Sequence, residues 1–100
     1  MEKIVGAIRE ISGDRYQPLR ELISDAPHPR KSEIIRYLNG AKVIAAAAGA
    51  MRDVMTGEYT GRELLIHSDG EYRWRSDTQY YVEKYNMSLP ENFIRHALGQ

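Results

Sequence analysis

The side chains in this sequence that could carry chemistry are three histidines, a few serines and a cluster of charged residues. His28, His67 and His96 stand far apart, and none has the short spacing to another ligand that is typical of a zinc site. A metal site or a general-base histidine would require them to meet a carboxylate in the folded chain. We therefore predict no metal site.

The serines are explained by local structure rather than by catalysis. Ser32, Ser76 and Ser88 each stand where a helix is expected to begin, and Ser68 precedes a turn. The glycines are scattered, without the spacing of a phosphate-binding loop. With no nucleophile or phosphate site in view, we expect a non-enzymatic protein that uses no cofactor.

The charged cluster of Asp69, Glu71, Arg73, Arg75 and Asp77 could be interpreted as catalytic. We interpret it instead as a solvated hairpin tip followed by a helix start. A negative charge in the first turn of a helix suits the helix dipole, and exposed ion pairs contribute little to stability.

A hairpin and a helix between Arg62 and Tyr85 must position these residues. Asp69-Gly70 predicts a two-residue turn, because glycine adopts positive φ at no steric cost and aspartate tolerates it. That turn places His67 opposite Tyr72 and Leu65 opposite Trp74. One face of the hairpin then carries Leu65, His67, Tyr72 and Trp74, and the other carries Leu64 and Ile66 opposite Arg75 and Arg73.

Two helices are expected after the hairpin. Ser76 with Gln79 predicts a capping box at the start of the first, and Asn86 a left-handed stop at its end. Its buried stripe would be Thr78, Tyr81, Val82 and Tyr85. Ser88 with Glu91 predicts a second capping box, and the last helix would bury Leu89, Phe93, Ile94 and Ala97.

Helices are also expected in the first forty residues. The spacing of Ile4, Val5, Ile8 and Ile11 predicts an amphipathic helix that ends at Ser12-Gly13. Further along, a short helix should follow Pro18, residues 25–30 should form a linker, and Ser32 should cap a helix that Asn39-Gly40 ends.

Residues 41–60 allow two interpretations. Four consecutive alanines favour a helix over Lys42–Met55, whereas a lone hairpin would be a marginal sheet and needs a third strand. We choose the strand, followed by a loop through Gly49. The prediction is a single α+β domain, 1–100, with N-terminal helices, two C-terminal helices and a three-stranded antiparallel sheet formed by residues 41–46, 62–67 and 71–75.

The composition is that of an ordinary globular domain, with 42% hydrophobic and 28% charged residues and a formal net charge of zero. There is no cysteine, which excludes disulfides and fits a cytoplasmic protein. The first residues do not resemble a signal peptide, and the longest apolar run, Val43–Met51, is too short to span a membrane. The lack of a basic block argues against a nucleic-acid partner.

The alternative to protein binding is a helix-turn-helix DNA-binding regulator that uses residues 32–55. It requires Lys42–Met55 to be helical and to follow a helix over Ser32–Leu38 after a short turn. Its exposed surface would be mainly alanine with Lys42 and Arg52, which offers few contacts to bases or phosphates. Protein binding is therefore the favoured interpretation.

Several segments resemble small uncharacterised bacterial cytoplasmic proteins: Ile34–Gly40, Ser68–Gly70 with Trp74, Ser76-Asp77, Tyr80–Tyr85 and Leu89–Ile94. Some of those proteins look like immunity partners of polymorphic or contact-dependent toxins. The shared segments are caps, turns and core aromatics, so the resemblance implies a fold with a strand after Gly40 and brings no catalytic residue. It also implies a toxin-neutralising role.

The expected function is therefore the binding of another protein, such as a toxin domain, in the bacterial cytoplasm, with a homodimer as a further arrangement. Arg73, Arg75, Asp77 and Tyr80 are the candidate partner-binding residues. Exposed aromatic side chains beside arginines are typical of binding hot spots. Tyr80 lies off the buried stripe, so it should point outward or pack on the last helix.

Overall fold

A computed structural model describes residues 2–100, in which a mixed sheet has the strand order β1-β4-β3-β2. β1 (Lys3–Ile4) runs parallel to β4 (Tyr72–Arg75), which pairs antiparallel with β3 (Tyr59–Ser68), and β3 pairs antiparallel with β2 (Lys42–Arg52). The helices are α1 (Arg9–Ser12), a 3-10 turn η1 (Leu19–Glu21), α2 (Lys31–Gly40), α3 (Asp77–Tyr85) and α4 (Glu91–Leu98). The α+β class is confirmed, but the sheet has a fourth, parallel strand that was not predicted.

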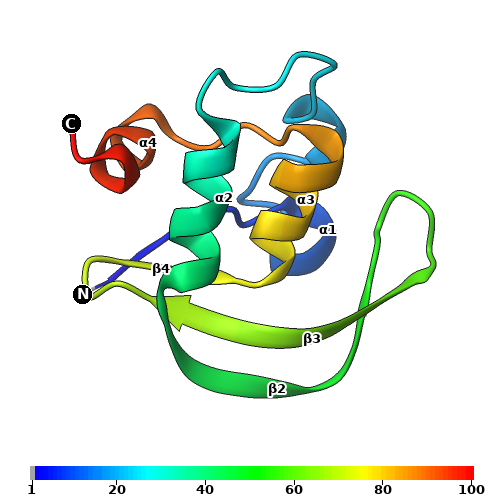
Figure 1. The fold of residues 1–100 in the computed structure, drawn as a ribbon. Coiled ribbons are helices and arrows are strands. Elements are labelled where there is room, and N and C mark those ends of the chain that lie inside the picture. Colours follow the sequence, from blue (N-terminus) through cyan, green and yellow to red (C-terminus); the bar gives the residue numbers. More distant parts are fainter. Residues whose placement is uncertain (1) are drawn as a thin grey trace.

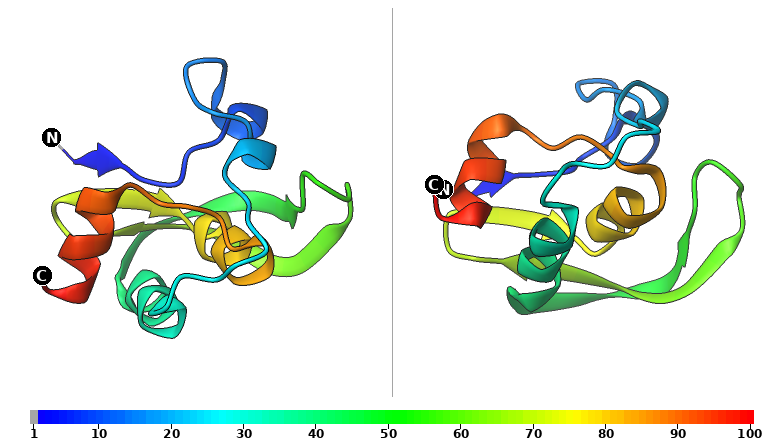
Figure 2. Two further views of the ribbon diagram at one scale, coloured as in Figure 1. Left: turned by 90° about the horizontal axis from the view of Figure 1, so that it is seen from above. Right: turned by 45° about the horizontal axis from the view of Figure 1, so that its top comes forward.

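The helices gather on one side of a curved β2–β3 ribbon. α2 and α3 pack against each other above the ribbon, and the loop that joins β2 to β3 rises beside α3 (Figure 1). Seen from above, β1 lies along β4, and α1 and η1 lie beyond the end of β1 (Figure 2). The N-terminal segment and β4 therefore lie side by side although most of the chain separates them in sequence.

The predicted N-terminal helix is wrong before Arg9. Lys3 N–H donates to the Glu71 carbonyl and Val5 N–H to the Arg73 carbonyl, each at 2.9 Å, so the segment is extended along β4. Gly6 then takes a left-handed conformation, with φ of +76°. The apolar spacing was interpreted as helical, but backbone partners on β4 satisfy these amides instead.

The predicted serine caps are also wrong, because α2, α3 and α4 begin without a side-chain cap hydrogen bond from Ser32, Ser76 or Ser88. The Ser76 side chain binds the backbone of β3 instead. Its Oγ accepts from Leu65 N–H at 2.9 Å and donates to the Glu63 carbonyl at 3.0 Å. It thereby fixes the start of α3 to β3.

Other N-terminal predictions hold. A 3-10 turn follows Pro18, residues 25–30 form the linker without a helix or strand, and α2 ends at Gly40. At the other end of the chain, Asn86 stops α3 with φ of 55°, as predicted.

The choice of a strand after Gly40 is confirmed. The predicted end at residue 46 and the predicted loop through Gly49 are wrong, because β2 continues to Arg52, with irregular pairing between Ala46 and Ala50. The helix needed for the helix-turn-helix alternative is therefore missing from the described residues. Side chains 42–50 are exposed, so the alanines do not belong to the intrachain core.

The hairpin register differs from the prediction by two residues. Asp69 N–H donates to the Tyr72 carbonyl at 3.1 Å, and Gly70, with φ of +96°, and Glu71 form the loop. His67 is consequently opposite Trp74 rather than Tyr72. Because a shift of two residues preserves the alternation of side chains, the predicted faces are retained.

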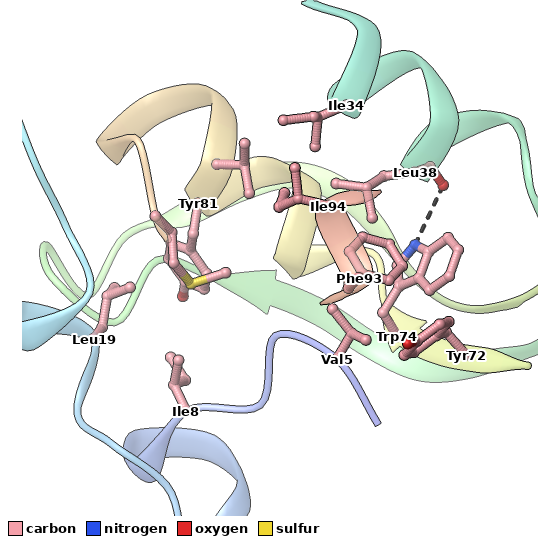
Figure 3. Packing of buried hydrophobic residues seen from close by; sticks show 12 residues of the cluster. Val5, Ile8, Leu19, Ile34, Leu38, Tyr72, Trp74, Tyr81, Phe93 and Ile94 are labelled. Carbon is pink, nitrogen blue, oxygen red and sulfur yellow. Dashed lines mark hydrogen bonds between the residues drawn. The ribbon is translucent and has the colours of Figure 1, made fainter. Parts of the chain in front are cut away.

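The core lies between the sheet and the helices and surrounds Trp74, which is 1% exposed (Figure 3). The indole Nε1–H donates to the Leu38 carbonyl at 3.2 Å, and His67 stacks on the ring at 5.9 Å. The predicted stripes of α3 and α4 are largely confirmed. Thr78, Tyr81, Val82, Phe93 and Ile94 are buried, while Tyr85, Leu89 and Ala97 are partly buried.

Candidate functional site

A pocket of about 310 Å³ lies between the N-terminal segment and the junction of β4 with α3. Its walls are apolar, and its charged residues are three arginines and one carboxylate. We call it the arginine pocket and define it by Ile4, Ile8, Ile11, Arg15, Ile66, Arg73, Arg75 and Asp77. Its size is at the lower end of the range for ligand pockets.

The sheet register brings these residues together. Alternation along β4 puts Arg73 and Arg75 on the face opposite Trp74, and Ile66 of β3 pairs directly with Arg75. β1 adds Ile4, which is 54% exposed, at the edge of the same sheet. The pocket thus depends on the parallel strand that sequence analysis missed.

Asp77 is the buried charge of the pocket, with its side chain 5% exposed. Burial raises the pKa of its carboxyl, and the attraction of the Arg75 guanidinium, 3.0 Å from Oδ2, offsets this rise only in part. Arg75 Nε is buried and has no acceptor among residues 2–100. Arg73 makes a looser contact, 3.5 Å from Glu2, and both side chains remain partly exposed. The pocket therefore has a surplus of positive charge.

The four predicted partner-binding residues separate into two groups. Arg73, Arg75 and Asp77 line the arginine pocket together. Tyr80 lies elsewhere, because its hydroxyl donates to Asp53 Oδ2 at 2.6 Å. Asp77 is the first residue of α3, as the predicted helix start requires, and its side chain is buried.

Asp53, which sequence analysis did not single out, is a second buried carboxylate with several hydrogen-bond donors. It is 1% exposed and accepts from the Tyr80 and Tyr85 hydroxyls at 2.6 and 2.8 Å and from the Met55 and Thr56 amides at 2.8 and 3.3 Å. Burial alone would raise the pKa of this carboxyl, but these donors together lower it. Asp53 thereby ties the β2–β3 loop to α3, and the spacing of the tyrosines in α3 was the only signal for it.

Asp69 joins the hairpin turn to two helices. Tyr37 of α2 and His96 of α4 both bond Asp69 Oδ2, the histidine at 2.8 Å, and His96 Nδ1 lies 3.2 Å from Glu71. The backbone amides of Glu71 and Tyr72 donate to Oδ1. The Asp69 side chain is 10% exposed, so the predicted solvated tip is wrong for this residue.

These contacts predict a specific loss of stability in acid. Burial raises the pKa of Asp69, but the donors from Tyr37, Tyr72, Glu71 and His96 lower it to about 2. A depressed folded-state pKa stabilises the protein above the unfolded pKa of about 3.9, by about 2–3 kcal/mol, and that contribution disappears as the pH falls from about 4 to about 2.

The measurement is the free energy of unfolding in urea between about pH 6 and pH 2. Asp69→Asn should be less stable near neutral pH and should lose less stability in this acid range than the wild type. Asp14→Asn, at an exposed position, is the control and should follow the wild-type curve. Parallel curves for Asp69→Asn and the wild type would contradict the assignment.

The histidines occupy separate places. His28 Nδ1 accepts from the Arg30 amide at 3.0 Å, and His67 Nδ1 lies 3.0 Å from the Ala41 carbonyl. Within residues 2–100, no group of three or more histidine, aspartate or glutamate side chains is arranged to hold a metal ion. In the same range, no helix combines the length and apolar character needed to cross a membrane.

The open edge of β2 is a weaker candidate for a binding surface. It exposes Val43 and Ile44, at 45% and 42%. However, irregular pairing interrupts the strand at several points, and bulges of this kind limit the addition of another strand.

Comparison of the sequence and structure with protein-family models, curated proteins and solved structures found no match.

Proposed function

We propose that this chain is a non-enzymatic protein-binding module whose contact surface is the arginine pocket. The observation that supports this proposal is the pocket itself, which has isoleucine walls, an excess of arginine and the 54% exposed Ile4 at its side. An apolar cavity beside arginines can hold an anchoring side chain of a partner, and such buried contacts supply most of the energy of an interface.

The more specific form of the proposal is neutralisation of a toxin in the bacterial cytoplasm. The toxin-neutralising role follows from the sequence resemblance, and the lack of cysteine is in keeping with a reducing compartment. In this role the pocket would cover part of the toxin by stoichiometric binding, and the chain would need no catalytic group of its own.

The experiment is affinity capture from the native host with the tagged protein, followed by mass spectrometry. The test variant is Arg15→Glu with Arg73→Glu, because both residues are accessible to solvent and neither holds a buried partner. Arg95→Glu is the control, since it reverses an exposed charge on α4, away from the pocket.

We expect the wild type and the Arg95→Glu control to retain the same protein in stoichiometric amount, and the pocket variant to retain at least about tenfold less, as expected for a loss of at least about 1.4 kcal/mol. Equal retention by all three proteins would contradict the pocket as the contact surface. A clean result with no protein bound to the wild type would contradict the proposed function.

A further inference from the structure

A second hollow adjoins the arginine pocket and has a volume of about 450 Å³. The two share the residues of the N-terminal segment and the wall formed by Arg15 and Tyr16. The second hollow is completed by Leu22 and Leu89, with Pro90 beside them. The two hollows therefore adjoin along the N-terminal segment, and we call the pair the N-terminal groove.

The charges along the N-terminal groove have a defined order. Arg15 lines both hollows, whereas Arg73, Arg75 and Asp77 line only the arginine pocket. Asp77 pairs with Arg75 at 3.0 Å and Glu2 lies 3.5 Å from Arg73, so three arginines meet only two carboxylates. Arg75 also retains its buried Nε–H without an acceptor. A planar guanidinium binds a carboxylate best through two parallel hydrogen bonds, so the groove is suited to added acidic groups.

Resting on the proposed function, we infer that the partner inserts a segment with the order apolar, acidic, apolar into the N-terminal groove. One apolar side chain fills the arginine pocket and the other fills the second hollow. The acidic side chain between them lies against Arg15, the cation that the two hollows share. A further acidic residue next to the first anchor would meet Arg73.

Other occupants fit the same surface less well. A nucleic acid fits less well, because isoleucine walls surround the three arginines and the formal net charge of the chain is zero, so little attracts further phosphates. A second copy could offer its own loop, where Met55 and Tyr59 are 45% and 64% exposed and flank Glu58. However, Arg52 lies over the Tyr59 ring at 4.2 Å, so that loop would bring a cation into a groove that already has a positive excess.

The test uses phage-displayed random twelve-residue peptides selected on the immobilised full chain. We expect enrichment of sequences in which an aspartate or glutamate lies between two large apolar residues. An enriched peptide, synthesised with a fluorophore, is then measured by fluorescence anisotropy. We expect Arg15→Glu and Ile4→Asp each to weaken binding at least about tenfold, and Arg95→Glu to leave it unchanged.

A charge exchange separates a direct contact from a folding defect. Replacing the acidic residue of the peptide by lysine should abolish binding to the wild type and restore at least part of it with Arg15→Glu. Enriched peptides without an acidic residue, absence of enrichment, or tight binding that Arg15→Glu leaves unchanged would each overturn the inference. A wild-type dimer in sedimentation equilibrium that Tyr59→Ser dissociates would also overturn it, because the groove would then hold a second copy.

The two proposals fail in different ways. If host capture yields a partner that depends on Arg15 and Arg73 but the selected peptides lack the apolar, acidic, apolar order, the protein-binding function stands and this inference fails. If the peptides follow the order and host capture yields no protein, the groove chemistry stands and the proposed function fails.

Discussion

Replacing Asp53 by alanine is expected to destabilise the protein by about 3 kcal/mol, because four partly buried donors would lose their buried acceptor together. The Tyr80 and Tyr85 hydroxyls and the Met55 and Thr56 amides all donate to this one carboxylate, which is 1% exposed. Lys84 adds a longer contact at 3.5 Å. Without Asp53, the β2–β3 loop would lose its attachment to α3.

The measurement is urea unfolding followed by the fluorescence of Trp74, the single tryptophan. Tyr85→Phe removes one donor and leaves the carboxylate with its others, so it should cost only about 1 kcal/mol. Asp14→Ala, at an exposed position, is the control and should change stability by less than about 0.5 kcal/mol. An Asp53→Ala protein as stable as the control would show that Asp53 does not hold the loop.

Gly6→Ala is expected to destabilise the protein by about 3 kcal/mol or more, for two additive reasons. Gly6 has φ of +76°, a conformation that side chains with a Cβ rarely adopt. A Cβ at this position would also lie 2.3 Å from Thr78 Oγ1 and 2.9 Å from Thr78 Cβ, and Thr78 is 1% exposed in the core. The N-terminal segment would have to move away from α3, which would also deform the N-terminal groove.

Gly57→Ala provides a matched control. Gly57 has the same φ of +76°, but a Cβ there would meet no atom within 4 Å. It should therefore cost only the backbone strain, about 1–2 kcal/mol. Thr78→Ala combined with Gly6→Ala should recover part of the additional loss, because it removes the two nearest atoms. Equal effects of the two glycine substitutions in thermal or urea unfolding would contradict the close packing of Gly6 on Thr78.

Local patterns were sufficient where neighbouring residues decide the structure. The alternation of side chains along the hairpin predicted the buried face that carries Trp74. This face was correct although the predicted register was wrong by two residues. Asn86 predicted the end of α3, because few other residues adopt a left-handed conformation. The strand after Gly40 was predicted because a lone hairpin needs a further strand. Arg73, Arg75 and Asp77 were also correctly grouped, since alternate positions on β4 and the next helical residue share one side.

Contacts between segments that are far apart in the sequence decided the rest of the structure. The spacing of Ile4 and Ile8 also suits a helix, and only the β4 carbonyls made the segment a strand. Asp53 and Asp69 are typical turn residues in sequence, yet side chains from α3 bind Asp53 and side chains from α2 and α4 bind Asp69. Tyr80 lies outside the arginine pocket, because its position on α3 faces the β2–β3 loop.

The chain by itself thus determined an α+β fold and the hairpin faces, and it placed Arg73, Arg75 and Asp77 close together. The tertiary structure alone decided the parallel strand, the hydrogen-bond partners of Asp53 and Asp69, and the N-terminal groove. The reason is physical: a local pattern reports which side chains avoid water, whereas hydrogen-bond partners and cavities depend on which distant segment covers them.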